Sequence, residues 1–351
     1  MKFAMLNEGA ARHTADRAAI YREVIETIDA AEAAGFDVFG CSEQHFWPDL
    51  PGLPSIATIS SPEIFYAVAS QRTEKMQLRT AITSLPYHHP LLVAEQVATL
   101  DIVSGGRMQF VSGRGNSLFT ADAFGVPMSE TEGRWEESLR LIVAAWESEG
   151  DFGWDGHFYQ VPPQPFLIKP VQKPHPPLFY AALSPRSHEL AGHLGLGLLT
   201  GTAGITLEKA AERIELYRTA MKDAEPIGQA KNEFVSLTVL GSCHEDRAVA
   251  RAQSEEAFID YYKAATAVYS QTVHRTAAEV DFSKIGGLYT FEDMSETMMI
   301  ISGTPDDWAD KIAQLRDAGV DEVSINFAGI EHEAILHSIE LLGREVFPRF
   351  R

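Results

Sequence analysis

Cysteine is scarce in this sequence: Cys41 and Cys243 are the only two, far apart and without CxxC spacing. This usage argues against a disulfide framework or a structural zinc site and indicates a reducing compartment. Long hydrophobic runs are also lacking, since no apolar stretch approaches the roughly 18 residues of a membrane span. The start "MKFAMLNEGA" has no hydrophobic segment ahead of a cleavage site. The sequence therefore predicts a cytoplasmic protein.

Basic residues are outnumbered, with 29 Lys and Arg against 49 Asp and Glu, which gives a formal net charge of −20 over 351 residues. A surface this acidic repels phosphate backbones and anionic lipids, so we expect neither nucleic acid nor a membrane as partner. Familiar catalytic motifs are missing as well. There is no GxSxG, and "HEAILH" (332–337) has one residue too many for the zinc motif HExxH. The glycines of "GHLGLG" (192–197) end a helical pattern and enter a strand, the reverse of a dinucleotide fingerprint.

The sequence does contain a series of strand–helix units. Residues 16–34 carry apolar side chains at helical spacing between a candidate N-cap, Asp16, and a candidate C-cap, Gly35, and the apolar strand "FDVFGCSE" follows directly. About eight short strands recur in this way. We expect them in 2–7, 36–43, 76–86, 107–115, 176–183 and 233–242, and in "GLGLLTG" and "VDEVSINF".

Alternation of short apolar strands with amphipathic helices indicates a parallel α/β fold, and eight units favour a (β/α)8 TIM barrel above a doubly wound sheet. We expect a single domain over residues 1–351. Two stretches exceed the needs of a barrel, at about 148–175 and 254–300. Such insertions usually lie over an active site, so we place them over the C-terminal face of the barrel.

Barrel enzymes carry their sites at the C-terminal ends of the strands, and polar side chains gather at the predicted strand exits. They are Asn7, Glu8, Glu43, Gln44, His45, Thr83, Ser84, His88, His89, Ser112, Arg114, Asn116, Ser184, Ser187, Thr200, Thr202 and Asn326. Hydroxyls, amides, one arginine and several histidines together suit a polar, phosphorylated ligand.

Two of these loops suit an anion. In "VSGRGNS" (111–117), glycines flank Arg114, whose guanidinium offers two donors to a phosphate, although a tight turn with a surface arginine fits the same residues. In "ALSPRSHE" (182–189), Ser184 and Ser187 open a helix whose free N–H groups attract anions, and plain N-capping is the alternative.

The pair Glu43 and His45 leaves several interpretations open. It can act in acid–base chemistry, or the carboxylate can hold the histidine for structure alone. A metal pair is a further interpretation, but the spacing offers no compatible third ligand, so we predict no metal site.

Longer stretches carry a resemblance. "AGFDVFGCSEQHF", "TAITSLPYHHP", "LDIVSGGRMQFVSGRGN", "FYAALSPRSHELAGHLG" and "SGTPDDWADKIAQLRDAGVDEVSINF" resemble the bacterial luciferase-like, flavin-dependent monooxygenases, and the match runs over nearly the whole chain. The resemblance implies a (β/α)8 barrel with FMN at its C-terminal mouth. It implies that the cofactor site includes a non-proline cis peptide at Ala81–Ile82 beneath the ring, a phosphate contact through Arg114, Ser184 and Ser187, and the neighbouring Gly113 and Leu183.

Two positions depart from luciferase itself. Gln44 stands where luciferase has its catalytic histidine, and Gly113 stands where it has a reactive cysteine. A glutamine cannot act as a general base near neutral pH. These departures argue against light emission but not against flavin binding.

The resemblance further implies a two-component monooxygenase. A separate flavin reductase would deliver reduced FMN, which reacts with dioxygen to a flavin hydroperoxide and oxygenates a small, fairly apolar aldehyde, ketone, hydrocarbon or sulfur compound. We predict catalytic roles for Glu43, Gln44, His45 and His89, and aromatic walls from Phe46, Trp47, Phe119, Phe124, Trp154 and Phe158. Two alternatives remain, a deazaflavin-dependent oxidoreductase of the same barrel family and a flavin-binding protein without turnover. A homodimer is also implied, for which helix 90–104 offers Leu92, Val97, Leu100 and Val103.

Overall fold

The structure of the protein is a computed structural model. It describes residues 1–10, 16–47, 50, 52–53, 55, 58–115, 117–273 and 290–351. The candidate ligand contact Asn116 and residues 274–289 of the second predicted insertion lie outside this described part.

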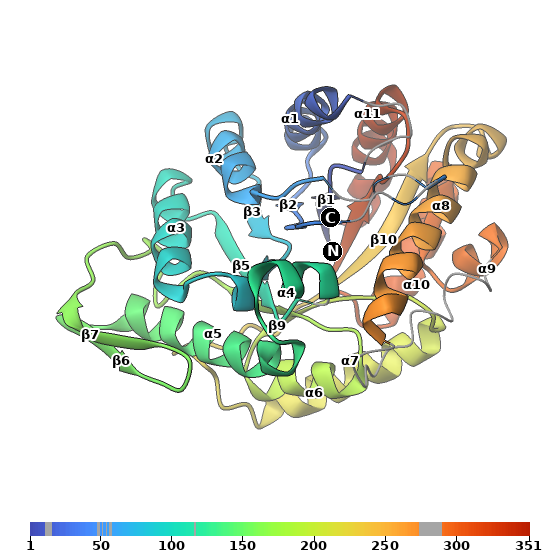
Figure 1. Cartoon of the computed structure of the whole chain (residues 1–351). Coiled ribbons are helices and arrows are strands. Elements are labelled where there is room, and N and C mark those ends of the chain that lie inside the picture. The colour runs from blue at the N-terminus through green and yellow to red at the C-terminus, as the bar shows by residue number, and fades with distance from the viewer. Residues whose placement is uncertain are drawn as a thin grey trace.

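Eight parallel strands form a closed barrel at the centre of the molecule (Figure 1). In barrel order they are β1 (Lys2–Asn7), β2 (Val38–Cys41), β3 (Gln77–Thr80), β5 (Met108–Gly113), β8 (Leu178–Ala181), β9 (Gly197–Gly201), β10 (Val235–Cys243) and β12 (Glu322–Asn326). Strand β1 pairs with β2 on one side and with β12 on the other, and this pairing of the first and last strands closes the barrel. The predicted (β/α)8 fold is confirmed.

Helices surround the strands (Figure 1). They are α1 (Arg17–Ala34), α2 (Pro62–Arg72), α3 (Pro90–Val103), α4 (Leu118–Phe124), α5 (Thr131–Glu147), α6 (Pro185–His193), α7 (Leu207–Lys222), α8 (Arg247–Val273), α9 (Phe291–Glu296), α10 (Pro305–Asp317) and α11 (His332–Leu341). The predicted caps of α1 are present, because the Asp16 side chain accepts a hydrogen bond from the Ala18 N–H and Gly35 adopts a left-handed φ of 83°. Within the described residues, no helix combines the length and the apolar character needed to cross a membrane.

Side chains from the strands fill the barrel interior. They include a buried ion pair. Arg79 on β3 and Glu322 on β12 are 2% and 0% exposed, and Arg79 Nη2 donates to Glu322 Oε2 at 3.0 Å. Arg79 Nε also donates to Gln109 Oε1 at 2.7 Å, and the guanidinium lies over the Phe179 ring. The charges are therefore paired and hydrogen-bonded, as burial requires.

The predicted strand at 76–86 is interrupted in the middle. After β3 the peptide bond between Ala81 and Ile82 is cis, as the resemblance implied, and the short strand β4 (Thr83–Ser84) then continues the pairing with β5. The break brings Ile82 and the residues after it to the mouth of the barrel.

The two predicted insertions have different positions. Residues 148–175 contain an antiparallel hairpin, β6 (Asp151–Asp155) and β7 (Gln160–Pro165), which lies beyond α5 at the lower left of Figure 1. Its Phe152 and Val161 pack against α5, so this hairpin does not cover the strand ends. In the second stretch, α8 reaches over the barrel mouth, and β11 (Ile300–Gly303), which the sequence did not predict, pairs with the end of β10.

Candidate active site

A cavity of about 420 Å³ lies at the carboxyl ends of the barrel strands. Its volume falls in the range of roughly 300–1,000 Å³ that small-molecule sites occupy. Most residues that the sequence singled out line it together, namely Glu43, Gln44, His45, Ile82, Gly113, Arg114, Leu183, Ser184 and Ser187. Ala81 is not part of the wall and contributes only its peptide bond to Ile82.

Glu43 is the centre of a hydrogen-bonded triad. Its carboxyl is buried, and Oε1 lies 2.8 Å from His45 Nε2 and 2.8 Å from His88 Nε2. The second oxygen, Oε2, accepts the Ser84 backbone N–H at 3.1 Å. The triad therefore joins the segment after β2 to the segment after β4. Glu43 and His45 line the cavity, whereas His88 does not.

The charges of this triad are set by its contacts. Burial raises the pKa of Glu43, but the hydrogen bonds from His45 and His88, together with their charges, lower it to about 2. Burial lowers the pKa of His88, and the hydrogen bond and charge of Glu43 raise it above its ordinary value of 6.5. An ionised carboxylate only accepts hydrogen bonds, so both Nε2 atoms carry a proton at neutral pH.

The neighbours His88 and His89 lie differently with respect to the cavity and Glu43. His89 is exposed, serves as the N-cap residue of α3, and has its ring 5.8 Å from that of Tyr159. It is not among the residues that line the cavity, whereas its neighbour His88 contacts Glu43. The geometry therefore gives no support to the catalytic role predicted for His89.

His88 also corrects the argument about metals. The sequence offered no third ligand for Glu43 and His45, but the ligand atoms of Glu43, His45 and His88 lie within 4.8 Å of one another, close enough for one ion. The hydrogen bonds account for the same short distances without an ion.

The chain turns sharply after His45. Phe46 has a φ of 54°, in the left-handed region that costs a non-glycine residue about 1–3 kcal/mol. The Phe124 ring of α4 lies edge-on to the His45 ring at 5.2 Å. Gln44 accepts a hydrogen bond from Trp47 Nε1, which occupies its side-chain oxygen and leaves its amide nitrogen beside the cavity.

The two loops that the sequence predicts to bind an anion both contribute to the cavity wall. Arg114 is exposed and has neither a hydrogen bond nor an ion pair with any described residue. Ser184 and Ser187 form a reciprocal capping box at the start of α6. The two serines therefore cap this helix, which was the alternative interpretation of their sequence pattern. Both serines still line the cavity, and the positive end of the α6 dipole therefore lies at the same wall as the free guanidinium.

Sequence reasoning missed several polar side chains of the cavity. Tyr87 lines it, and its buried hydroxyl has no hydrogen-bond partner in the part of the chain that is described. Burial, and then the Glu43 charge, raise the pKa of Tyr87 to about 12, while Arg114 opposes the shift. Tyr261 and Tyr262 reach the cavity from α8, and no sequence pattern distinguishes them from other tyrosines of an amphipathic helix.

The aromatic residues that were predicted to line the cavity lie elsewhere, and other aromatic residues line it. Trp154 donates to Glu137 Oε1 at 3.2 Å, and Phe158 lies under the Arg134 guanidinium, so both belong to the hairpin beside α5. None of the six predicted aromatic residues lines the cavity. Its aromatic side chains are Tyr87, Tyr180, Tyr261 and Tyr262 instead.

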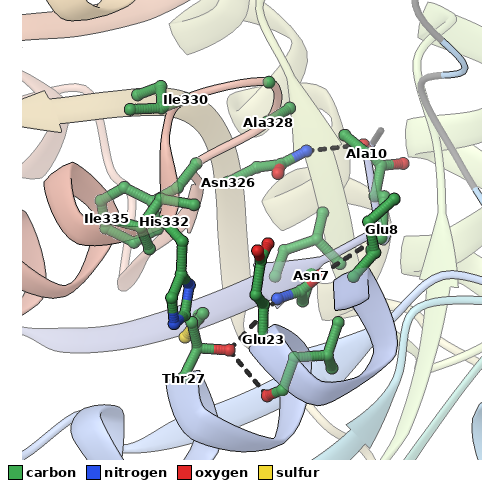
Figure 2. Close-up of a pocket in the computed structure, with 17 residues that line it drawn as sticks. Asn7, Glu8, Ala10, Glu23, Thr27, Asn326, Ala328, Ile330, His332 and Ile335 are labelled. Carbon is green, nitrogen blue, oxygen red and sulfur yellow. Dashed lines mark hydrogen bonds between the residues drawn. The ribbon is translucent and has the colours of Figure 1, made fainter. Parts of the chain in front are cut away.

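A smaller cavity of about 40 Å³ lies next to the first, between the ends of β1 and β12 and helices α1 and α11 (Figure 2). Asn7 Nδ2 donates to Thr27 Oγ1 at 3.3 Å along its wall. It has room for water but not for a cofactor. Glu8 and Asn326 line both cavities.

Comparison with known proteins identifies the family. The model of the luciferase-like monooxygenase family matches residues 1–322 of the chain. The chain belongs to the luciferase-like monooxygenases. Among curated members of that family, limonene 1,2-monooxygenase of Rhodococcus erythropolis is 26% identical over 96% of this chain and 84% of its own length. The oxygenase component of the flavin-dependent trigonelline monooxygenase of Acinetobacter baylyi is 25% identical over 94% of this chain and 90% of its own length.

Several solved structures have the same fold. The monooxygenase RslO1 of Streptomyces bottropensis superposes with a TM-score of 0.84 at 23% identity, and each chain is covered completely. The oxygenating constituent of 3,6-diketocamphane monooxygenase of Pseudomonas putida, solved with FMN, gives 0.80 at 18% identity, covering 100% of this chain and 99% of its own. An F420-dependent secondary alcohol dehydrogenase gives 0.77 at 18%, again over 100% and 99%. These likenesses establish the fold, and the last shows that the fold also serves a deazaflavin enzyme.

Proposed function

We propose that this protein is an FMN-dependent monooxygenase that uses reduced FMN and dioxygen to oxygenate a small, fairly apolar organic substrate. The observation that carries the proposal is the convergence of two groups on one cavity. Arg114, which pairs with no described residue, lines the cavity together with the start of α6, and Glu43 and His45 of the triad line the same cavity.

The residues present fit FMN. Its phosphate is a dianion, which suits an unpaired guanidinium next to a helix N-terminus. Gly113 leaves the wall flat, because a Cβ there would lie only 2.4 Å from Ile82 Cδ1. Tyr87 and Thr202 also line the cavity, and their buried hydroxyls have no hydrogen-bond partner among the described residues. When bound, reduced FMN supplies the electrons that activate dioxygen.

In this proposal His45 moves the proton. Its Nε2–H is held by Glu43, so Nδ1 is the atom left to give or take a proton at a ligand in the cavity. His88 does not line the cavity; it holds Glu43 ionised and in place from behind. Glu43 and His88 are positioning residues, and His45 is the catalytic residue.

The remaining wall excludes water from the reaction. Apolar side chains of neighbouring strands, including Leu199 of β9 and Val239 and Leu240 of β10, line the cavity, and α8 covers it with tyrosines. A site with such walls protects a reactive oxygen species from stray protons. A separate flavin reductase is the proposed source of reduced FMN, in line with the relative named as an oxygenase component.

The proposal is tested by supplying photoreduced FMN and ¹⁸O-labelled dioxygen to the pure protein with a panel of aldehydes, ketones, hydrocarbons and thioethers. We expect one class to gain a single labelled oxygen atom. Tight binding of F420 and reduction of a carbonyl or oxidation of an alcohol without label would replace the monooxygenase by the deazaflavin alternative. FMN binding with release of peroxide alone, across the whole panel, would contradict oxygenation and leave a flavin-binding protein.

A further inference from the structure

Glu8 is an ionisable group of the cavity that the proposed reaction does not use. It follows β1 directly, is partly buried, and lines both the large and the small cavity. In the described part of the chain, no hydrogen bond connects it to Glu43, His45 or His88. It is therefore a second carboxyl group at the barrel mouth with its own set of partners.

The described hydrogen bonds to the Glu8 carboxyl all reach one of its two oxygens. Tyr261 Oη on α8 and Asn326 Nδ2 on β12 both donate to Oε2, each at 2.6 Å. Figure 2 shows the Asn326 side chain extended toward Glu8. No donor among the described residues reaches Oε1. Because Oε2 already accepts two hydrogen bonds, a proton on this carboxyl belongs on Oε1.

The surroundings of Glu8 favour the protonated form. Burial raises the pKa of Glu8, and the hydrogen bonds from Tyr261 and Asn326 lower it by less. Among the described residues, the basic side chains that line the cavity are His45 and Arg114, and neither makes a hydrogen bond or ion pair with Glu8. A carboxyl group whose pKa is raised in this way keeps its proton to a higher pH than an exposed one, and the protonated form donates a hydrogen bond.

We propose that Glu8 binds the oxygen function of the substrate by donating a hydrogen bond from Oε1 to a carbonyl oxygen. This inference rests on the proposed monooxygenase function and narrows its substrate class. Ketones and aldehydes on an apolar skeleton satisfy both the Glu8 donor and the aliphatic wall. Plain hydrocarbons and thioethers leave the donor without a strong acceptor, which costs binding free energy in a buried site.

The test is a binding measurement on the full chain with FMN present. Cyclohexanone and cyclohexane differ in one carbonyl group, and calorimetry gives the ratio of their dissociation constants. Glu8→Leu should shift this ratio by about tenfold against the ketone, the effect of one hydrogen bond. Glu8→Gln should keep the wild-type ratio, because the amide oxygen accepts from Tyr261 and Asn326 while its NH₂ donates to the ketone.

Glu23→Leu is the matched control. Glu23 lines the small cavity and not the large one, so its loss should leave the ratio unchanged. A Glu8→Leu variant with the wild-type ratio overturns the proposal. So does a Glu8→Gln variant that loses the ketone preference, since Glu8 would then act as an anion that accepts a hydrogen bond. Either failure leaves oxygenation by reduced FMN untouched, and conversely a retained ketone preference without any oxygenation counts only against the proposed function.

Discussion

At the scale of single residues, the Glu43 carboxylate connects His45, two residues away, to His88, which lies 45 residues further along the chain. Glu43 and His45 lie in one short segment, so their meeting could be predicted, and Arg114 stood out as a cation between glycines. The position of His89 outside the cavity wall has a local cause. A 3₁₀ turn over Leu85–Tyr87 ends at His88, whose ring is turned to Glu43, and the next residue already caps α3 and turns outward. Adjacent residues at such a boundary point in different directions, which composition does not reveal.

Arg114 provides the sharpest residue-level test of the cofactor site. Arg114→Ala should weaken binding of reduced FMN by about 1.5–3 kcal/mol, because it removes a hydrogen bond to a charged group. Arg186→Ala is the control: Arg186 lies in the first turn of α6, but it is ion-paired with Glu132 and does not line the cavity. Anaerobic fluorescence titration measures both affinities, and an equal loss in the two variants would place the phosphate elsewhere.

The Glu43–His88 contact predicts a titration. By NMR, the pKa of His88 should lie above 6.5 in the wild type, and Glu43→Gln should lower it, because burial then acts without the opposing charge. Glu63→Gln, which removes a nearby acid that acts by charge alone, should lower it less. Protonation of His88 stabilises the folded state. This stabilisation is complete below pH 6.5 and is lost as the pH rises through the raised pKa of His88. That linked to Glu43 is present above pH 4.5 and is lost only as pH falls toward about 2. A pKa of His88 that is the same with and without the Glu43 charge would contradict this account.

At the scale of helices and strands, the spacing of apolar residues predicted the elements that pack between neighbouring elements on both sides. The stripe Trp135, Leu139, Ile142 and Trp146 is fully buried, and each of the eight predicted barrel strands is present. The sequence did not predict β11. Among the described strands, this short strand pairs only with the end of β10, and it is not preceded by a helix that ends at a glycine, which marks the repeated strand–helix units. It also placed the hairpin over the site, although its apolar residues pack on α5, because local sequence does not say which surface a hairpin covers.

The ion pair between β3 and β12 is a further feature that only the closed barrel brings together. Glu322→Ala should lower the free energy of unfolding by about 3–5 kcal/mol, since it leaves Arg79 buried without a counter-charge. The double variant Arg79→Met/Glu322→Leu should recover most of this loss. Glu340→Ala, which breaks an exposed pair with Arg344, should cost less than about 1 kcal/mol. Urea denaturation measures all three, and a mild effect of Glu322→Ala would mean that water or another group compensates Arg79.

At the scale of the whole molecule, the barrel separates the two kinds of apolar residue on helix α3. Val97 and Leu100 are 3% and 6% exposed because they pack on the strands, whereas Leu92 and Val103 are 51% and 47% exposed. Ile64 on the neighbouring helix α2 is 67% exposed. The sequence could not make this distinction, because all four residues of α3 satisfy the same helical pattern.

These outward residues give the predicted homodimer a definite surface. If α2 and α3 form the contact, Leu92→Glu/Val103→Glu places charges in an apolar interface and should convert a dimer into a monomer, because desolvating unpaired carboxylates outweighs the apolar burial. Light scattering after size exclusion measures the mass. Leu216→Glu, at a 39% exposed position on α7, should leave the mass unchanged. A wild-type monomer would contradict the dimer itself, and a dimer that survives the double substitution would move the contact away from α3.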